Sequence, residues 1–262
     1  MGGFSYAGNL IGVGTPVVRR FLTGESMYVG QLVKSARAAG IGGAVAVADI
    51  AVDGREDTSQ IIGICTGIVD GSSAYTKPVS GTAAYGQGTT YSATMATILA
   101  TGPSEVEVTL VIPGVTLVRA PIYDTTWGTA LTEVVEDNGD ANGVTITHAG
   151  ETIVDCNDDM ATIYCRSGAN KGLYRVVTTV GANAQVVTIP FPHTIGVGDV
   201  FVVASCVLGL GGMDLTTTFD AIDGNNAMND YYTVYYHDIN LEESGKEYAI
   251  FSFWSGPEPE AT

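Results

Sequence analysis

The sequence predicts an all-β protein built from two small antiparallel β-barrel or β-sandwich domains. Residues Glu105 to Ile112 (EVEVTLVI) alternate strictly between polar and apolar, as a half-buried strand does. Many other short runs are rich in β-branched residues and are separated by Gly, Asn, Asp or Pro. No convincing long helix interrupts this pattern. Together these observations favour a fold of about a dozen strands.

The expected organisation has four parts. Residues 1–25 mix glycines with scattered apolar residues and are expected to form an extended N-terminal arm. Residues 26–112 form the first β-domain, with a long insertion at 70–103 that is rich in Gly, Ser and Thr. Residues 113–254 form the second β-domain, and 255–262 form a flexible acidic tail. Long unstructured loops are uncommon in compact domains, so the arm and the insertion are expected to be ordered by contacts with neighbours.

Individual strands follow from the same pattern, taken along the chain. Gly209–Gly212 is read as a flexible break rather than as a strand. The expected strands are 28–33, 44–50, 61–69, 105–112, 116–121, 163–166, 173–180, 186–189, 200–207, 231–237 and 248–254.

The stretch from Ile163 to Val203 carries a recognisable series of turns. A Ser-Gly-x-Asn-x-Gly turn is followed by a strand with an arginine, then Val-Thr-Ile, Pro-Phe-Pro and Gly-x-Gly-Asp-x-Phe. This order resembles a β-module that recurs in structural proteins of tailed-phage virions. In the first domain, VGQLVKSA, AVAVADIAVDG and IIGICTGIVDG resemble the first domain of small phage capsid-decoration proteins.

The resemblance implies a capsid decoration (cement) protein of a tailed bacteriophage. Such a protein is assembled in the host cytoplasm and binds the exterior of the virion head. Its expected partners are the phage major capsid protein and copies of itself, arranged as a trimer. Two alternatives remain: a tail, neck or head-fibre subunit, or a carbohydrate-binding or adhesive β-sandwich. The aromatic platform of the last would come from exposed rings at Trp127, Trp254 and the tyrosines of YYTVYYH.

Composition limits the partners further. The chain has 262 residues, with 11 basic and 28 acidic side chains and a formal net charge of −17. Phosphate backbones and anionic lipids repel such a surface, so neither nucleic acid nor membrane is expected as a partner. Charged residues make up only 15% of the chain, below the ~25% usual for soluble domains. This low density fits either a surface largely covered by other subunits or an ordinary Thr- and Gly-rich β-protein.

No catalytic motif is found. The three histidines, His148, His193 and His237, lie far apart and have no nucleophile or carboxylate at a recognised spacing. The four cysteines lack zinc-ligand spacing, and we expect them to be reduced and mostly buried: Cys65, Cys156, Cys165 and Cys206. The chain is therefore predicted to be no enzyme and to need no cofactor, and no catalytic, cofactor-binding or metal residues are assigned.

One segment has a partial calcium-loop pattern. In EDNGDANG, Asn138, Asp140, Asn142 and Gly143 supply oxygens at alternate positions and a glycine for the turn. The acidic residue that should complete the loop is displaced, because Ala149 takes its place and Glu151 comes two positions late. An Asp/Asn/Gly hairpin turn explains the segment without metal, and this interpretation is favoured. Asp220, Asp223, Asn225 and Asn226 form a similar polar turn.

Overall fold

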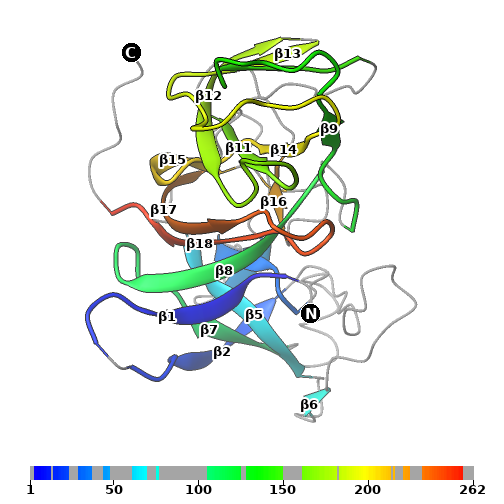
Figure 1. Ribbon diagram of the computed structural model, residues 1–262. Coiled ribbons are helices and arrows are strands. Elements are labelled where there is room, and N and C mark those ends of the chain that lie inside the picture. The colour runs from blue at the N-terminus through cyan, green and yellow to red at the C-terminus, as the bar shows by residue number, and fades with distance from the viewer. Residues whose placement is uncertain are drawn as a thin grey trace.

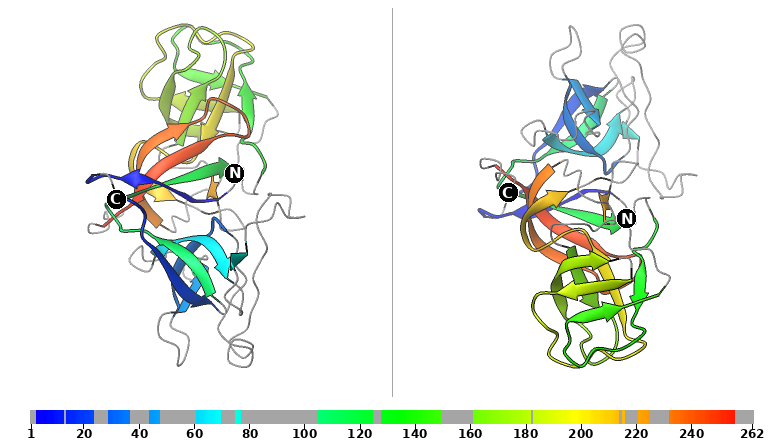
Figure 2. Two further views of the ribbon diagram at one scale, coloured as in Figure 1. Left: turned by 90° about the horizontal axis from the view of Figure 1, so that it is seen from below. Right: turned by 90° about the horizontal axis from the view of Figure 1, so that it is seen from above.

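In the computed structural model the chain is all-β, as predicted, and the strands form three sheets that are stacked along the molecule (Figures 1 and 2). The structure describes residues 3–12, 14–23, 29–36, 44–47, 61–69, 75–76, 105–124, 128–149, 161–181, 183–213, 215, 221–224 and 232–255. In Figure 1 a small barrel lies at the bottom, a curled sheet in the middle and a six-stranded sheet at the top. No helix occurs in these described ranges.

The bottom unit, called the proximal barrel, is a closed ring of five strands. The ring runs β3–β4–β2–β7–β5 and returns to β3, because β3 pairs with both β4 and β5. All its pairings are antiparallel except the parallel pair of β2 with β4. The short strand β6 pairs antiparallel with β5 and lies outside the ring. The strands are β2 (Val18–Thr23), β3 (Leu32–Ala36), β4 (Ala44–Val47), β5 (Ile61–Val69), β6 (Tyr75–Thr76) and β7 (Glu105–Leu110).

The middle unit, called the curled sheet, has the order β1–β8–β18–β17–β15, with β16 added in parallel to β8. Alternate residues of β8 and β17 are buried on one face, as Val118, Ala120, Tyr232, Val234 and Tyr236 show. The other face is more exposed. The strands are β1 (Ser5–Asn9), β8 (Thr116–Tyr123), β15 (Gly209–Met213), β16 (Ile222–Asp223), β17 (Tyr232–Asn240) and β18 (Tyr248–Phe253).

The top unit, called the distal unit, is a sheet in the order β10–β13–β12–β11–β14–β9. Its buried side chains form a core of their own, which includes Ile163, Phe191, Ile195 and Phe201. The strands are β9 (Glu133–Val135), β10 (Thr145–Thr147), β11 (Ala161–Cys165), β12 (Tyr174–Gly181), β13 (Ala184–Val187) and β14 (Val200–Ala204).

One hydrophobic core joins the three units. The buried rings of the curled sheet pack against Leu32 and Ile64 of the proximal barrel and against Val202 and Ala204 of the distal unit. A buried ion pair adds a polar link, because Arg166 at the end of β11 contacts Glu247, which precedes β18, at 2.6 Å. The Arg166 side chain is 7% exposed and that of Glu247 is fully buried. Arg166 also pairs with Glu133, so it is the loss of Arg166 that would leave a buried charge, that of Glu247, without its counterion, which is costly.

The first 25 residues are part of the body of the subunit in the described ranges. Strand β1 pairs with β8 of the curled sheet, and β2 pairs with β7 in the proximal barrel. Phe4 is buried, and its ring packs edge-on against Phe251. The segment is extended, but it contributes to two sheets and to the shared core. Removing it would therefore damage the fold.

Several other expectations have definite outcomes. The expected break at Gly209–Gly212 is wrong, because these glycines lie in β15, which pairs with β17. The insertion at 70–103, apart from the backbone of β6, and the tail after Ser255 lie outside the described residues. Cys65, Cys165 and Cys206 are free and buried, as predicted, and Cys156 lies outside the described part.

Candidate interaction surfaces

The polar residues of the virion-module resemblance hold turns of the distal unit. The Ser167 hydroxyl accepts a hydrogen bond from Val200 N at 2.8 Å. The Asn170 amide, fully buried, donates to His193 O at 2.9 Å and accepts from His193 N at 3.1 Å. The Asp199 carboxylate accepts from Gly196 N at 2.8 Å. Ser167 is thus bonded to the start of β14 and Asn170 to the backbone of a distant turn, whereas Asp199 is bonded within its own turn. The role of these side chains is to fix the shape of the loops.

The acidic segment at 136–143 has a similar structural role. Glu136 is buried, and its Oε1 accepts N–H groups of Asn138 and Gly139 at 2.9 and 2.7 Å. Its Oε2 accepts from Thr147 N at 2.6 Å. The Glu136 carboxylate thereby joins the end of β9 to β10, the two outer strands of the distal sheet. This role of Glu136 was not evident from the sequence, because it requires knowing that β9 and β10 meet.

Asp140 organises the turn that follows. Its Oδ1 accepts from Asn142 N, and its Oδ2 accepts from Val144 N and Thr145 N, all at 2.8 Å. Desolvation opposes ionisation of this carboxyl, but the three backbone hydrogen bonds outweigh it, so its pKa lies below the ordinary 3.8. The carboxylate is therefore an anion at neutral pH.

This geometry favours the turn interpretation of the segment over a calcium loop. The carboxylate oxygens of Glu136 and Asp140 already face N–H donors, whereas a cation needs them as free ligands. Within the described residues, no three His, Cys, Asp or Glu side chains gather in a way that could hold a metal ion. Glu151 and three residues of the second polar turn, Asp220, Asn225 and Asn226, lie outside the described part, and Asp223 is buried in β16.

The histidines lie in three separate environments. His148 is buried with its Nε2 3.2 Å from the Gln185 amide nitrogen. His193 contributes backbone groups to the Asn170 contact. His237 Nε2 lies 3.0 Å from the Ser252 hydroxyl, and partial burial lowers the pKa of its imidazole below 6.5. No two of them are brought together.

The aromatic strand β17 divides its rings between core and surface. Tyr232 and Tyr236 are buried in the core, and Tyr235 is exposed with its ring centroid 4.9 Å from that of His237. Tyr231 and Trp127 lie outside the described residues. A sugar-binding platform made of both tyrosine pairs is therefore contradicted, because half of its rings fill the core.

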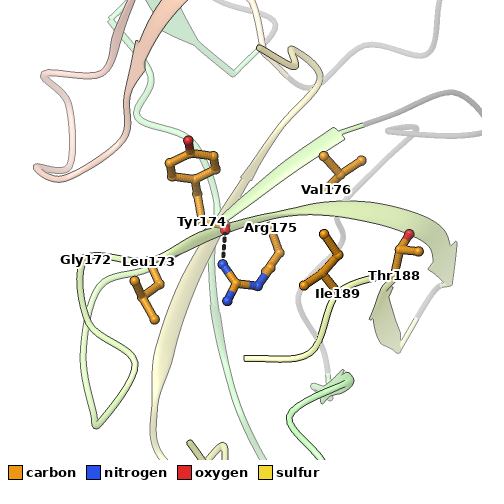
Figure 3. Close-up of a pocket in the computed structure, with 7 residues that line it drawn as sticks. All are labelled: Gly172, Leu173, Tyr174, Arg175, Val176, Thr188 and Ile189. Carbon is orange, nitrogen blue, oxygen red and sulfur yellow. Dashed lines mark hydrogen bonds between the residues drawn. The ribbon is translucent and has the colours of Figure 1, made fainter. Parts of the chain in front are cut away.

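An apolar groove runs along the distal unit where β12 extends beyond the end of β13 (Figure 3). Its volume is about 500 Å³, and its residues are Gly172, Leu173, Tyr174, Arg175, Val176, Thr188 and Ile189. Tyr174 and Ile189 are 52% and 66% exposed. Arg175 lies over the Phe191 ring at 5.0 Å and donates to Tyr174 O and Pro190 O, which holds its side chain in place.

A second apolar surface lies where the proximal barrel meets the curled sheet, and we call it the junction patch. It consists of side chains from the β1–β2 loop, the start of β2 and the β7–β8 turn: Leu10, Ile11, Val17, Val18 and Ile112. Backbone hydrogen bonds hold these segments side by side, from Leu10 N to Val115 O and from Leu110 N to Val17 O. Nothing in the sequence distinguished these apolar residues from core residues.

Arg19 adds a positive charge beside the junction patch. Its exposed guanidinium donates to Val18 O at 3.3 Å, and no carboxylate contacts it in the described part of the chain. The neighbouring Arg20 instead pairs with Glu107 at 3.2 Å. Both arginine side chains are exposed to solvent.

The chain was compared with known proteins at three levels. No described helix is long and apolar enough to span a membrane. Neither the family models, the curated proteins nor the solved structures gave a match to this chain.

Proposed function

We propose that this chain is a virion structural protein of a tailed bacteriophage, and specifically a capsid decoration (cement) protein. It binds the outside of the head and stabilises the lattice of the major capsid protein by non-covalent contacts. It acts together with further copies of itself, without a cofactor, and it makes or breaks no bond. The virion exterior is its place of action.

The observation that carries this proposal is the structural role of the polar residues in the stretch from Ile163 to Val203, which resembles the virion module. Ser167, Asn170 and Asp199 all bond to backbone: Ser167 to the start of β14, Asn170 to a distant turn and Asp199 within its own turn. Because the polar groups of this motif bind loop backbone, the motif maintains the shape of the loops and is not arranged for catalysis. Shape and surface are what a protein needs when it works by contact alone.

The apolar groove supplies a surface suited to such a contact. It combines an exposed tyrosine, an exposed isoleucine and the arginine side chain of Arg175, which is held against Phe191. Tyrosine and arginine are enriched among the residues that dominate binding energy at protein interfaces. We assign the groove as the face that contacts the shell, with a side chain of the major capsid protein packing against Ile189 beside Arg175.

The mechanism follows from mass action. A protein that binds the expanded shell but not its dissociated subunits stabilises the shell in proportion to its occupancy. Because the lattice repeats, several linked copies multiply modest single-site affinities. No strong individual contact is required.

The test mixes purified chain with expanded shells of the major capsid protein that lack decoration. We expect the chain to sediment with the shells, to raise their melting temperature and to appear on the outer surface in a cryo-EM map. Ile189→Asp should weaken shell binding by about tenfold, because it places a charge in the apolar groove. Val197→Asp, at a site that is 69% exposed outside the groove, is the matched control and should bind normally.

Two results would overturn the proposal. One is a wild-type chain that does not bind the shells at any concentration. The other is a map of the complete particle that places the subunit in the tail, the neck or a head fibre, which would favour the alternative virion roles. Normal shell binding by Ile189→Asp would contradict the assignment of the groove while leaving the function intact.

A further inference from the structure

The junction patch concentrates exposed apolar surface to an unusual degree. Eleven large hydrophobic side chains are exposed among the described residues, and five of them belong to this patch. Ile11 alone is 80% exposed. Scattered exposed hydrophobic residues are normal, but a contiguous group marks a surface that another molecule covers.

The surroundings of the junction patch are positively charged, whereas the chain as a whole is strongly negative. Residues 10–19 and 109–116, which form the patch and its surroundings, contain no Asp or Glu, although the chain has 28 acidic residues. Arg19 adds a cation with no carboxylate contact in the described part of the chain. An acidic molecule with some apolar surface is therefore the complementary partner, and other copies of this chain, at a net charge of −17, have that chemistry.

Strand β9 of the distal unit offers the complementary features. Glu133, Val135 and Asp137 are exposed at alternate positions. Because Glu133 pairs with Arg166, Asp137 is the acid beside Val135 that can face a second copy. β9 pairs with β14, and the residues that follow it bond to Thr147 of β10, so the second copy contacts its exposed side chains rather than a strand edge. Figure 1 places β9 at the upper right and the β1–β2 loop at the lower left, so the two surfaces lie at opposite ends of the molecule.

We propose that the junction patch of one copy binds strand β9 of a second copy, with Arg19 facing Asp137 and Ile11 covering Val135. Because the two surfaces differ and lie far apart, the contact is head-to-tail, and repetition produces a ring or an open chain of subunits. The proposal rests on the proposed function in that a decorated lattice requires linked copies, and it names the surfaces that link them.

Self-association of the full chain in solution tests the proposal. Sedimentation velocity over a wide range of protein concentration should show oligomers of the wild type that grow with concentration. Ile11→Asp should weaken association by about tenfold or more, because it adds an anion that faces an acidic strand. Ile189→Asp, a matched change in the groove of the distal unit, should associate as the wild type does.

A charge exchange tests the assignment of β9. Arg19→Asp and Asp137→Arg should each weaken association, and the double variant should recover most of it. Both side chains are exposed, so the variants should fold, which circular dichroism and thermal unfolding can check. A wild type that stays monomeric throughout, or an Ile11→Asp variant that associates normally, would overturn the proposal. Failure of the double variant to recover would overturn the pairing with β9.

The shell-binding assay separates this inference from the proposed function. If the wild type oligomerises through the patch but never binds shells, the proposed function fails and the interface stands. If the wild type binds shells as a monomer and Ile11→Asp binds equally well, the interface fails and the proposed function stands.

Discussion

The proximal barrel and the distal unit close their sheets in different ways. In the proximal barrel the backbone of five strands completes a ring, since β3 pairs with β5 as well as with β4. In the distal unit the last strands, β9 and β10, are joined by one backbone hydrogen bond from Asp137 N to Thr147 O and by the carboxylate of Glu136. The first closure depends on close approach of backbones, and the second depends on one backbone hydrogen bond and one buried side chain.

This difference predicts which substitutions destabilise each unit most. A ring of backbone hydrogen bonds has many equivalent contacts, so its stability is sensitive to anything that forces strands apart. A closure made by Glu136 has one buried charged group at its centre, and its loss leaves N–H donors without partners.

The largest effect is expected for Gly63→Ala in the proximal barrel. A Cβ at Gly63 in β5 would lie 2.1 Å from the carbonyl oxygen of Thr109 on the neighbouring segment, so the strands must separate. We expect the free energy of unfolding to fall by about 4 kcal/mol, measured by urea denaturation. Gly211→Ala in β15 is the control, since its Cβ would meet only ordinary contacts at 3.7 Å. Equal effects of the two changes would contradict the close-approach argument.

The next effect is expected for Glu136→Ala in the distal unit. Loss of three charge-assisted hydrogen bonds should lower the free energy of unfolding by about 3 kcal/mol. Glu136→Gln keeps the size and one acceptor oxygen, so it should fall between the wild type and the alanine variant.

Thiol labelling can show that the effect of Glu136→Ala is local. Burial raises the pKa of Cys65 in the proximal barrel to about 12 and that of Cys165 in the distal unit to about 11, against lowering by backbone hydrogen bonds. Neither thiol is reactive until its own unit opens. Peptide mapping should show faster labelling of Cys165 in the variant and unchanged labelling of Cys65. Parallel acceleration of both would mean that the two units open together.

The sequence predicted the units that have regular patterns. The alternation predicted for 105–112 holds in the first half of β7, where Val106 and Val108 are buried and Glu107 is more exposed. It fails beyond that, because Thr109 and Val111 are buried and Ile112 is 56% exposed. Among the strands missed, β9 is short and β15 is rich in glycine, and their partners are distant in sequence. A strand of three residues has too few positions to show a period, so only its partner strand reveals it.

The candidate surfaces were harder to predict than the fold. An exposed Ile11 and a buried Ile64 have the same chemistry, and only the packing of distant segments decides which is covered. The segment at 136–143 was correctly favoured as a turn, because Asp, Asn and Gly have strong local preferences. The bridging role of Glu136 depends on long-range topology, which local preferences do not encode.

A moderate effect is expected for Gly168→Ala in the turn between β11 and β12. Gly168 and Gly172 both have positive φ, at +78° and +89°, so alanine is strained at either position. At Gly168 a Cβ would also collide with the Asp199 carboxylate, which accepts a hydrogen bond from Gly196 N. We expect a loss of about 2 kcal/mol for Gly168→Ala and about 1 kcal/mol for Gly172→Ala, by urea denaturation. The reverse order would contradict the role of Asp199 in fixing the turn.

The smallest effect concerns pH and the Asp140 carboxylate of the distal unit. Its pKa is lowered in the folded state, where three backbone N–H bonds outweigh desolvation. A group with a depressed folded pKa stabilises the fold above its unfolded pKa, and this contribution is lost as the pH falls through the folded pKa. Asp140→Asn removes the titrating group, so it should be less stable than the wild type near neutral pH, by about 1 kcal/mol.

The difference between wild type and Asp140→Asn should then shrink as the pH is lowered from about 5 to below the folded pKa. Other carboxyl groups titrate in the same range, but they are common to both proteins and cancel in the comparison. Labelling of Cys165 should follow this difference, while labelling of Cys65 in the proximal barrel should not, because that barrel is closed by backbone alone. If the two stability curves ran parallel over the whole acid range, the hydrogen bonds to Asp140 would not favour its charged form. The Asp140 carboxylate would then not be a source of acid sensitivity in the distal unit.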